Sequence, residues 1–294
     1  MTKVLSGVIS AIATPVREDG APDLQRAIKL ARFLLDNGCD GLNVLGTTGE
    51  ATSFSVTERS AVMKAYKENG LPLERLMVGT GAAATSDAIT LTKAADELGF
   101  GGALVLPPFY YKGAPDDGLI AYIDALVRAT RIPIYLYNYP AMSGLPWHVG
   151  LIERLLKSHS SRILGLKDSS GDMAYARAAA ALAPGFAVFP SNEAALLAAR
   201  RGDFAGCISA TANLNADLCA LAWRNGEAVA LDAAVAIRKL FEGKPLVSGV
   251  KALLAHIHSD PALARMKPPL VAFSAADTTA ATAGYDAVRS RRAA

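Results

Sequence analysis

The sequence is poor in cysteine, and this scarcity limits the compartments that suit it. The 294 residues include three cysteines, Cys39, Cys207 and Cys219, with no CxxC spacing between them. An odd number of cysteines in apolar surroundings argues against a disulfide framework and favours free thiols in a reducing compartment. We therefore expect a cytoplasmic protein.

Long apolar runs and blocks of one charge are also missing. No stretch approaches the roughly 18 uninterrupted apolar residues of a membrane span, and the first apolar stretch contains glycine and serine, unlike a signal peptide. The 30 basic and 27 acidic side chains are scattered and give a net charge of +3. Without a charged block, neither a nucleic acid nor a membrane is an expected partner, and a small molecule is.

Aromatic residues and metal-binding motifs are scarce as well. Aromatics make up 7% of the chain and hydrophobic residues 51%, so the core must be built mainly from Ala, Leu, Val and Ile. The histidines are His148, His159, His256 and His258. All lie in or beside predicted helices, none at ligand spacing from a carboxylate or cysteine, so we expect no metal.

Short β-rich apolar runs recur along the chain in alternation with helical patterns. The eight runs cover residues 7–15, 40–46, 75–81, 101–108, 132–138, 162–170, 186–191 and 206–211. The segments between them have apolar spacings of three and four residues, and several begin with Asp, Ser or Thr and end with Gly. This alternation predicts parallel strands joined by right-handed crossovers.

A closed (β/α)₈ barrel, the TIM barrel, explains these units better than an open doubly wound sheet. The units are of similar size, no GxGxxG follows the first strand, and no flexible linker interrupts them. From about residue 214 onward the chain has only helical patterns. We therefore predict a barrel with the active site over residues 1–225 and a helical C-terminal extension over 226–294, packed on the barrel as one structural unit.

Lys167 lies near the end of the sixth predicted strand, where barrel enzymes place their active groups. Strand alternation directs Asp168 to the opposite face. An inward lysine is partly desolvated, which favours the free amine that attacks a ketone. A lysine at the solvent-exposed end of a strand is the alternative interpretation.

Two further segments could assist such a lysine. Tyr135, Tyr137 and Tyr139 share one face of the fifth strand if it is regular, and a phenol near the lysine could relay protons. Aromatic packing is the alternative, and we prefer it for Tyr135. GTTGE at 46–50 could bind a carboxylate through backbone N–H groups, although a plain turn also fits.

Five motifs, in this order and at these strand ends, resemble the dihydrodipicolinate synthase / N-acetylneuraminate lyase family of Schiff-base class I aldolases. They are GTTGE at 46–50, PPFYY at 107–111, YNYP at 137–140, GLKDSSG at 165–171 and ISATAN at 208–213. Order and spacing agree over essentially the whole chain, including KPPL near its end.

The resemblance implies a role for each matching residue. Lys167 forms the imine with a 2-oxo acid, pyruvate, and Tyr137 shuttles protons at the reacting carbons. Thr47 and Thr48 bind the pyruvyl carboxylate, and Thr48 also links Tyr137 into the relay. Ile208 contacts pyruvate through its main chain.

The resemblance also implies an assembly. Tyr110 corresponds to a tyrosine that crosses a tight dimer interface into the neighbouring subunit's site, and this explains the exposed aromatic loop. A homotetramer built from tight dimers is expected. No cofactor is expected beyond the covalent imine.

Met142 departs from the family's pattern. Dihydrodipicolinate synthases resemble one another in having an arginine at this place, two residues after the YNxP proline, which binds the carboxylate of aspartate semialdehyde. Methionine cannot form that bidentate ion pair. The synthase reaction is therefore in doubt, although Lys112 offers a cation from another loop.

Polar residues at the ends of strands six and seven favour a different substrate. Ser169, Ser170, Asn192 and Glu193 could hydrogen-bond a polyhydroxy chain, as in relatives that cleave 2-keto-3-deoxy sugar acids or sialic acid. Ordinary helix capping explains them equally well.

The function we expect is reversible aldol cleavage of a 2-oxo acid by a pyruvate-dependent aldolase, with a 2-keto-3-deoxy sugar acid as substrate and an aldehyde as the second product. The alternatives are 4-hydroxy-tetrahydrodipicolinate (dihydrodipicolinate) synthase and a dehydratase that uses the same imine. A non-catalytic 2-oxo-acid binding protein is the alternative of another class.

Overall fold

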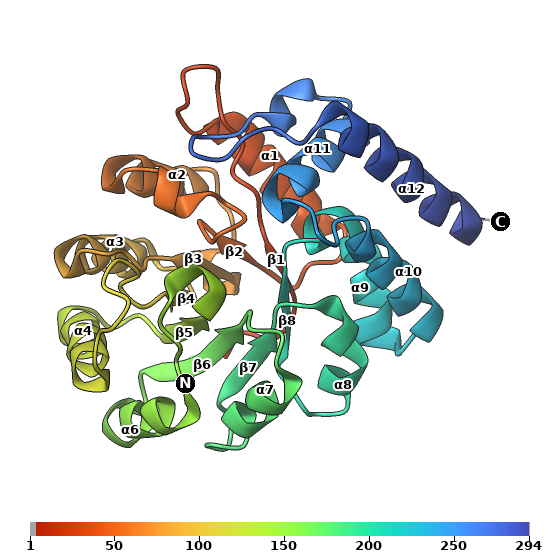
Figure 1. Cartoon of the computed structure of the whole chain (residues 1–294). Helices are drawn as coiled ribbons and strands as arrows, with labels where there is room; N and C mark the ends of the chain where they lie inside the picture. The colour runs from red at the N-terminus through yellow and green to blue at the C-terminus, as the bar shows by residue number, and fades with distance from the viewer. Residues whose placement is uncertain (1–3, 294) are drawn as a thin grey trace.

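Eight short parallel strands form a nearly closed barrel at the centre of the molecule (Figure 1). The computed structural model describes residues 4–293. The strands are β1 (Gly7–Ala11), β2 (Gly41–Val44), β3 (Leu76–Gly79), β4 (Gly102–Val105), β5 (Ile134–Asn138), β6 (Ile163–Asp168), β7 (Ala187–Pro190) and β8 (Gly206–Ser209). Each lies within one of the eight apolar runs, so the predicted (β/α)₈ fold is confirmed.

The strands follow one another around the barrel in sequence order, and the ring closes where β1 pairs with β8. The order is β7-β6-β5-β4-β3-β2-β1-β8. β1 pairs with β8 in parallel, with Ile9 opposite Ile208. Between β7 and β8, the Ala205 N–H donates to the Val188 carbonyl at 2.9 Å. The carboxyl ends of all eight strands therefore point to the same end of the barrel.

Helices surround the strands (Figure 1). They are α1 (Leu24–Asp36), α2 (Val56–Glu68), α3 (Thr85–Leu98), α4 (Asp116–Ala129), α5 (Pro140–Ser143), α6 (Val149–His159), α7 (Met173–Ala180), α8 (Leu196–Arg200), α9 (Ala212–Asn225), α10 (Ala228–Lys239), α11 (Leu246–Ile257) and α12 (Ala275–Ala293). Single 3₁₀ turns are η1 (Ala51–Ser53), η2 (Leu73–Arg75), η3 (Glu193–Ala195) and η4 (Pro261–Ala264). Within residues 4–293, every helix is too short or too polar to cross a bilayer.

Helix ends carry the signals that the sequence suggested. Ser55 and Glu58 form a reciprocal capping box at the start of α2, each side chain accepting from the other's backbone N–H. Gly99 ends α3 with φ of 91°, in the left-handed region that glycine adopts without strain. These local caps set where each crossover returns to the barrel.

The barrel interior is filled at the amino ends of its strands by Tyr135 and its neighbours. A Cβ added at Gly102 or Gly165 would lie 2.6 Å or 2.8 Å from the Tyr135 ring, so both glycines make room for it. The Tyr135 hydroxyl accepts a hydrogen bond from the Leu5 N–H at 3.2 Å. Tyr135 is therefore a packing residue.

The helices after α9 pack side by side against one flank of the barrel (Figure 1). Asn215 of α9 is fully buried, and its side-chain amide donates to the Ala234 carbonyl of α10 at 3.0 Å. Further along, fully buried Lys251 of α11 donates to the Thr14 carbonyl at 3.1 Å. The late helices therefore contact residues from the start of the barrel.

Candidate active site

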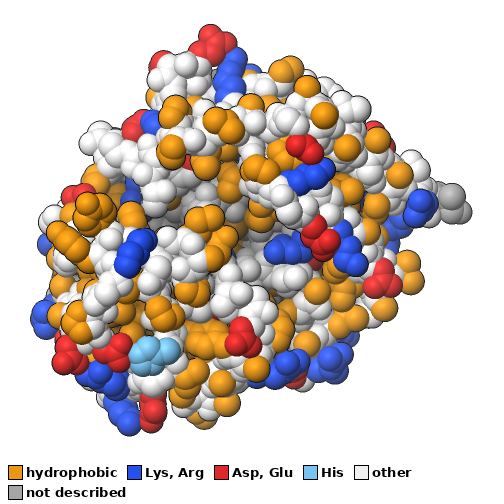
Figure 2. Space-filling model, in the orientation of Figure 1, with side chains coloured by type: hydrophobic (Ala, Val, Ile, Leu, Met, Phe, Trp, Pro, Cys, Tyr) orange, Lys and Arg blue, Asp and Glu red, His pale blue; other side chains and the backbone are white. Residues whose placement is uncertain are grey.

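A cavity of about 550 Å³ opens at the carboxyl ends of the strands. Figure 2 shows the face of the molecule seen in Figure 1, hollowed near its middle. Residues from β5, β6, β8, α5, α10, α11 and the loops after β2, β6, β7 and η4 surround the cavity. They are Thr47, Thr48, Tyr137, Tyr139, Met142, Lys167, Ser169, Ser191, Ile208, Ala210, Arg238, Lys244, Pro245, Leu246, Val247, Ser248, Met266, Pro269, Leu270 and Val271.

Lys167 lies at the bottom of this cavity, with 3% of its surface exposed. It pairs in register with Tyr137 on the adjacent strand, and its Nζ lies 4.2 Å from the centre of the Tyr137 ring. Asp168 instead accepts hydrogen bonds from Asn138 Nδ2 at 2.8 Å and Ser170 Oγ at 2.9 Å. The expected alternation, with Lys167 inward and Asp168 on the other face, is confirmed.

Tyr137 is linked to Thr47, whereas the sequence analysis expected Thr48. The hydroxyl oxygens of Tyr137 and Thr47 lie 3.2 Å apart. Leu45, between β2 and the GTTGE loop, has φ of 54°, and this left-handed residue interrupts the alternation of the strand. The first threonine therefore faces the tyrosine, and Thr48 lines the cavity beside it.

Glu50 anchors the loop that carries both threonines. Its N–H donates to the Thr47 carbonyl at 3.0 Å, and its side chain is buried. Lys251 of α11 forms a short ion pair with one carboxylate oxygen, and the Lys267 N–H donates to the other at 2.7 Å. The C-terminal extension therefore fixes the position of the threonine loop.

The aromatic loop after β4 points away from the cavity of its own chain. Tyr110 and Tyr111 are 74% and 76% exposed, and neither lines the cavity. Lys112 Nζ donates to the Phe109 and Ser143 carbonyls at 2.6 and 3.0 Å. Lys112 thus binds backbone oxygens and is not a cation of the cavity wall.

Glu193 does not line the cavity, contrary to the expectation that it contacts substrate. Its carboxylate is fully buried. Ser209 and Thr211 donate to it at 2.8 and 2.5 Å, Asn215 Nδ2 at 2.9 Å, and Arg238 Nη1 at 3.2 Å. Each oxygen of the Glu193 carboxylate already accepts two hydrogen bonds, so none of its lone pairs is left for a substrate. The donors come from β8, α10 and the first turns of α9.

The other polar residues at the ends of β6 and β7 divide into two groups. Ser169 lines the cavity. Ser170 donates to Asp168, and Asn192 Oδ1 accepts from the Ala194 N–H at 3.0 Å. Ser170 and Asn192 therefore act as local caps, leaving Ser169 of this set beside the substrate space.

Arg238 is a residue of the cavity wall that was not among the predicted site residues. It lies in the last turn of α10, where a basic residue is ordinarily explained by the helix dipole. Its side chain nevertheless lines the cavity. No local motif could have indicated this, since the placement depends on how α10 packs beside β8.

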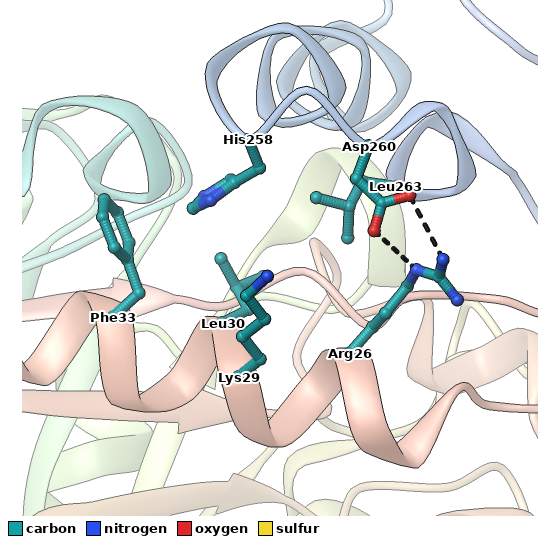
Figure 3. A pocket seen from close by; sticks show the side chains of 7 residues that line it. All are labelled: Arg26, Lys29, Leu30, Phe33, His258, Asp260 and Leu263. Atoms are coloured by element: carbon teal, nitrogen blue, oxygen red, sulfur yellow. Dashed lines mark hydrogen bonds and ion pairs between the residues drawn. The ribbon is translucent and has the colours of Figure 1, made fainter.

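A second, smaller cavity lies between α1 and the segment from α11 to η4 (Figure 3). Its volume is about 50 Å³, room for a few water molecules. The Arg26–Asp260 ion pair, with Nε 2.7 Å from Oδ2, lies at one side, and His258 packs edge-on against Phe33. Burial lowers the pKa of His258 and so disfavours its charged form. No group of three His, Cys, Asp or Glu side chains in residues 4–293 could bind a metal.

Comparison with known proteins agrees with the geometry at the barrel mouth. Residues 4–283 match the model of the Dihydrodipicolinate synthetase family. The chain belongs to this family. An uncharacterized DapA-like lyase from Chloroflexus aurantiacus is 33% identical over 290 residues, with 96% of each chain covered. The chain is accordingly a lyase, with a fold shared by pyruvate aldolases.

Solved structures of the fold include both synthases and sugar-acid aldolases. The dihydrodipicolinate synthase of Agrobacterium tumefaciens superposes with a TM-score of 0.89 at 28% identity, covering 96% of this chain and 99% of that one. A variant of the 2-keto-3-deoxygluconate aldolase of Sulfolobus solfataricus gives a TM-score of 0.87 at 20% identity, with 97% of each chain covered. The latter likeness concerns the fold alone.

Proposed function

We propose that this lyase is a class I aldolase whose Lys167 forms an imine with the 2-oxo group of pyruvate or a pyruvyl substrate. The observation that supports this most is the pairing of a buried lysine with a buried phenol, 4.2 Å from Nζ to the ring centre, at the bottom of the large cavity. The Tyr137–Thr47 contact of 3.2 Å gives that phenol a proton-transfer partner.

The chemistry uses residues of this chain and needs no cofactor. Lys167 Nζ adds to C2 of the oxo acid, and the phenol of Tyr137 supplies the proton with which the C2 oxygen leaves as water, so that the protonated imine and the tyrosinate of Tyr137 result. In the cleavage direction, Tyr137 takes the proton of the C4 hydroxyl, the C3–C4 bond breaks, and its electron pair moves into the iminium to form an enamine. The same proton is delivered to C3, and water then hydrolyses the imine to release pyruvate.

Thr47 and Thr48 suit the pyruvyl carboxylate, because both side chains line the cavity on a loop of tight turns. Ile208 contributes its main chain at the end of β8. We propose a 2-keto-3-deoxy sugar acid as the substrate class, since Ser169 offers a hydroxyl to the chain beyond C3 and Met142, 60% exposed at the cavity, offers no charge.

Borohydride reduction in the presence of pyruvate tests the imine directly. We expect one pyruvyl adduct per chain, located at Lys167 by peptide mass mapping, because reduction makes the imine a stable amine. Lys167→Arg, which keeps the positive charge, is the matched control and should give no adduct. Folded protein that fails to form an adduct at Lys167 would contradict the proposal and leave a non-catalytic 2-oxo-acid binding protein as the better reading.

Dihydrodipicolinate synthase is the second candidate, favoured by the 28%-identical Agrobacterium structure. A dehydratase would use the same imine but release water in place of an aldehyde. Product analysis with pyruvate plus aspartate semialdehyde, pyruvate plus glyceraldehyde, and a 2-keto-3-deoxy sugar acid alone separates the three reactions.

We further propose a homotetramer built from tight dimers, in which Tyr110 enters the neighbouring subunit's site. Exposure of 74% for Tyr110 and 76% for Tyr111 supports a surface that another copy covers. Three buried, unpaired cysteines in the described chain fit a cytoplasmic location, and burial raises the pKa of the Cys39 thiol to about 12.

Mixed dimers test the shared site. Tyr110→Phe and Lys167→Ala are each expected to be poorly active alone, whereas subunits exchanged between the two variants should regain activity. The mixed dimer contains one site with its own Lys167 and the partner's Tyr110, so up to half of the sites are complete. Mixing Lys167→Ala with Tyr137→Phe is the control, because both losses there affect groups that belong to their own chain's site. Equal behaviour of the two mixtures would exclude a shared tyrosine.

A further inference from the structure

Arg238 is the charged residue of the cavity that the proposed imine chemistry does not use. It projects from the last turn of α10, and 25% of its side chain is exposed. It lines the same cavity as Lys167. A guanidinium at such a place offers donors to an anion beyond the pyruvyl group.

The guanidinium is fixed from one side only. Glu193, whose carboxylate is fully buried, accepts from Arg238 Nη1 at 3.2 Å. Ser209 and Thr211 hydroxyls lie 3.4 Å from the same nitrogen and themselves donate to Glu193. Among the described residues no partner is found for Nε or Nη2 of Arg238. A rigid anchor therefore positions a guanidinium that still has free donors.

The charges around the cavity favour an anionic ligand. Its lining includes Lys167, Arg238 and Lys244 and contains no aspartate or glutamate. Lys244 is neutralised by Asp277, with Nζ 2.9 Å from Oδ1, and Lys167 is committed to the imine. Glu193 balances the charge of Arg238 but lies outside the lining. The free guanidinium donors are thus the cationic feature left for the rest of the substrate.

Two phenols line the same cavity as the lysine and the guanidinium. The ring centres of Tyr137 and Tyr139 are 5.9 Å apart. Burial and the nearby Tyr137 raise the pKa of Tyr139, and the positive charge of Arg238 partly opposes that rise. Lys167, both phenols and Arg238 line one cavity, so a substrate attached to Lys167 occupies the space that Arg238 also faces.

We infer that Arg238 binds an anionic group, a carboxylate or a phosphate, at the end of the aldehyde substrate away from its reacting carbonyl. This rests on the proposed aldolase function and narrows its substrate class from sugar acids whose only anion is the pyruvyl carboxylate to those with a second anionic group. Bidentate binding by the free edge of a guanidinium suits both anions. Arg238 is then a residue that determines specificity and takes no part in bond cleavage.

Paired aldehydes test the inference. With pyruvate as donor, succinic semialdehyde is compared with butanal, and glyceraldehyde 3-phosphate with glyceraldehyde, so that each pair differs by one anion. Arg238→Met should lower kcat/KM for the anionic member of the preferred pair by about 10- to 100-fold, mainly through KM, and leave the neutral member within about twofold. The pair with the larger loss identifies the anion as carboxylate or phosphate.

Two further variants keep the test interpretable. Lys239→Met removes the adjacent cation, which is exposed, and should leave kcat/KM unchanged for both the anionic and the neutral aldehyde. Arg238→Lys retains a charge for Glu193 if Arg238→Met does not fold, and should lose part of the preference because the fork of donors is gone. Equal losses for anionic and neutral aldehydes, in variants that still form the borohydride adduct with pyruvate, would overturn the inference. Absence of that adduct in the unmodified enzyme would instead overturn the aldolase proposal.

Discussion

Tyr137→Phe should lower kcat for aldol cleavage by about 10²- to 10⁴-fold, the range that a positioned general acid–base group contributes. The variant keeps the ring beside Lys167 and removes only the hydroxyl that lies 3.2 Å from Thr47. Imine formation with saturating pyruvate should still be detectable by borohydride trapping, because the nucleophile is unchanged. The measurement is steady-state kinetics alongside the yield of trapped adduct.

Tyr135→Phe is the matched control for this loss. Tyr135 is on the same strand and in the barrel interior, but its hydroxyl accepts from the Leu5 N–H and lies outside the cavity lining. Removing that hydroxyl should reduce stability slightly and leave kcat within about twofold, since a lost neutral hydrogen bond costs about 1 kcal/mol. If both phenylalanine variants lose activity equally, the phenol of Tyr137 has no special part in proton transfer.

Lys251→Met should destabilise the folded protein by about 3 to 5 kcal/mol, because it leaves the Glu50 carboxylate buried without its countercharge. Both members of the pair are at most 2% exposed. The loss should appear as a lower midpoint of guanidinium unfolding. It should also weaken pyruvate binding, since Glu50 anchors the loop of Thr47 and Thr48.

The comparison that isolates the ion pair is the double variant Glu50→Gln with Lys251→Met. It removes both charges and keeps an oxygen for the Lys267 N–H, so its stability should lie well above that of Lys251→Met alone. Lys64→Met, which breaks an exposed Lys64–Glu68 pair, should change stability by no more than about 0.5 kcal/mol. A double variant as unstable as the single one would mean that the buried charge is not the source of the loss.

The barrel could be predicted from the sequence because each strand is a buried apolar run bounded by loop and capping residues. The predicted runs were longer than the strands; that of β1, for example, extended to Pro15 whereas the strand ends at Ala11. Residues after a strand end can remain buried without pairing to a neighbouring strand; Ala13 is buried, and its N–H donates to the Asn213 side chain at 3.1 Å. Apolar character therefore located the strands but not their ends.

The sequence predicted the direction of a side chain correctly where strand alternation sets it. It did not do so where a turn or the packing of a distant helix sets that direction. Lys167 and Asp168 fall on the expected faces of β6. The positive φ of Leu45 changed which threonine meets Tyr137. Glu193 and Arg238 pair across 45 positions of sequence. No local pattern therefore indicates that Glu193 lies outside the cavity lining or that Arg238 is part of it.

The ion pair between Glu50 and Lys251 also sets an order of events during synthesis. Its partners are 201 positions apart. At a translation rate of about 5 to 20 residues per second, Glu50 is added to the chain about 10 to 40 s before Lys251. A nascent chain that has completed β6 already contains Lys167, but its threonine loop lacks the contacts that fix it. The proposed pyruvate site is therefore expected to form only after α11 has been synthesised.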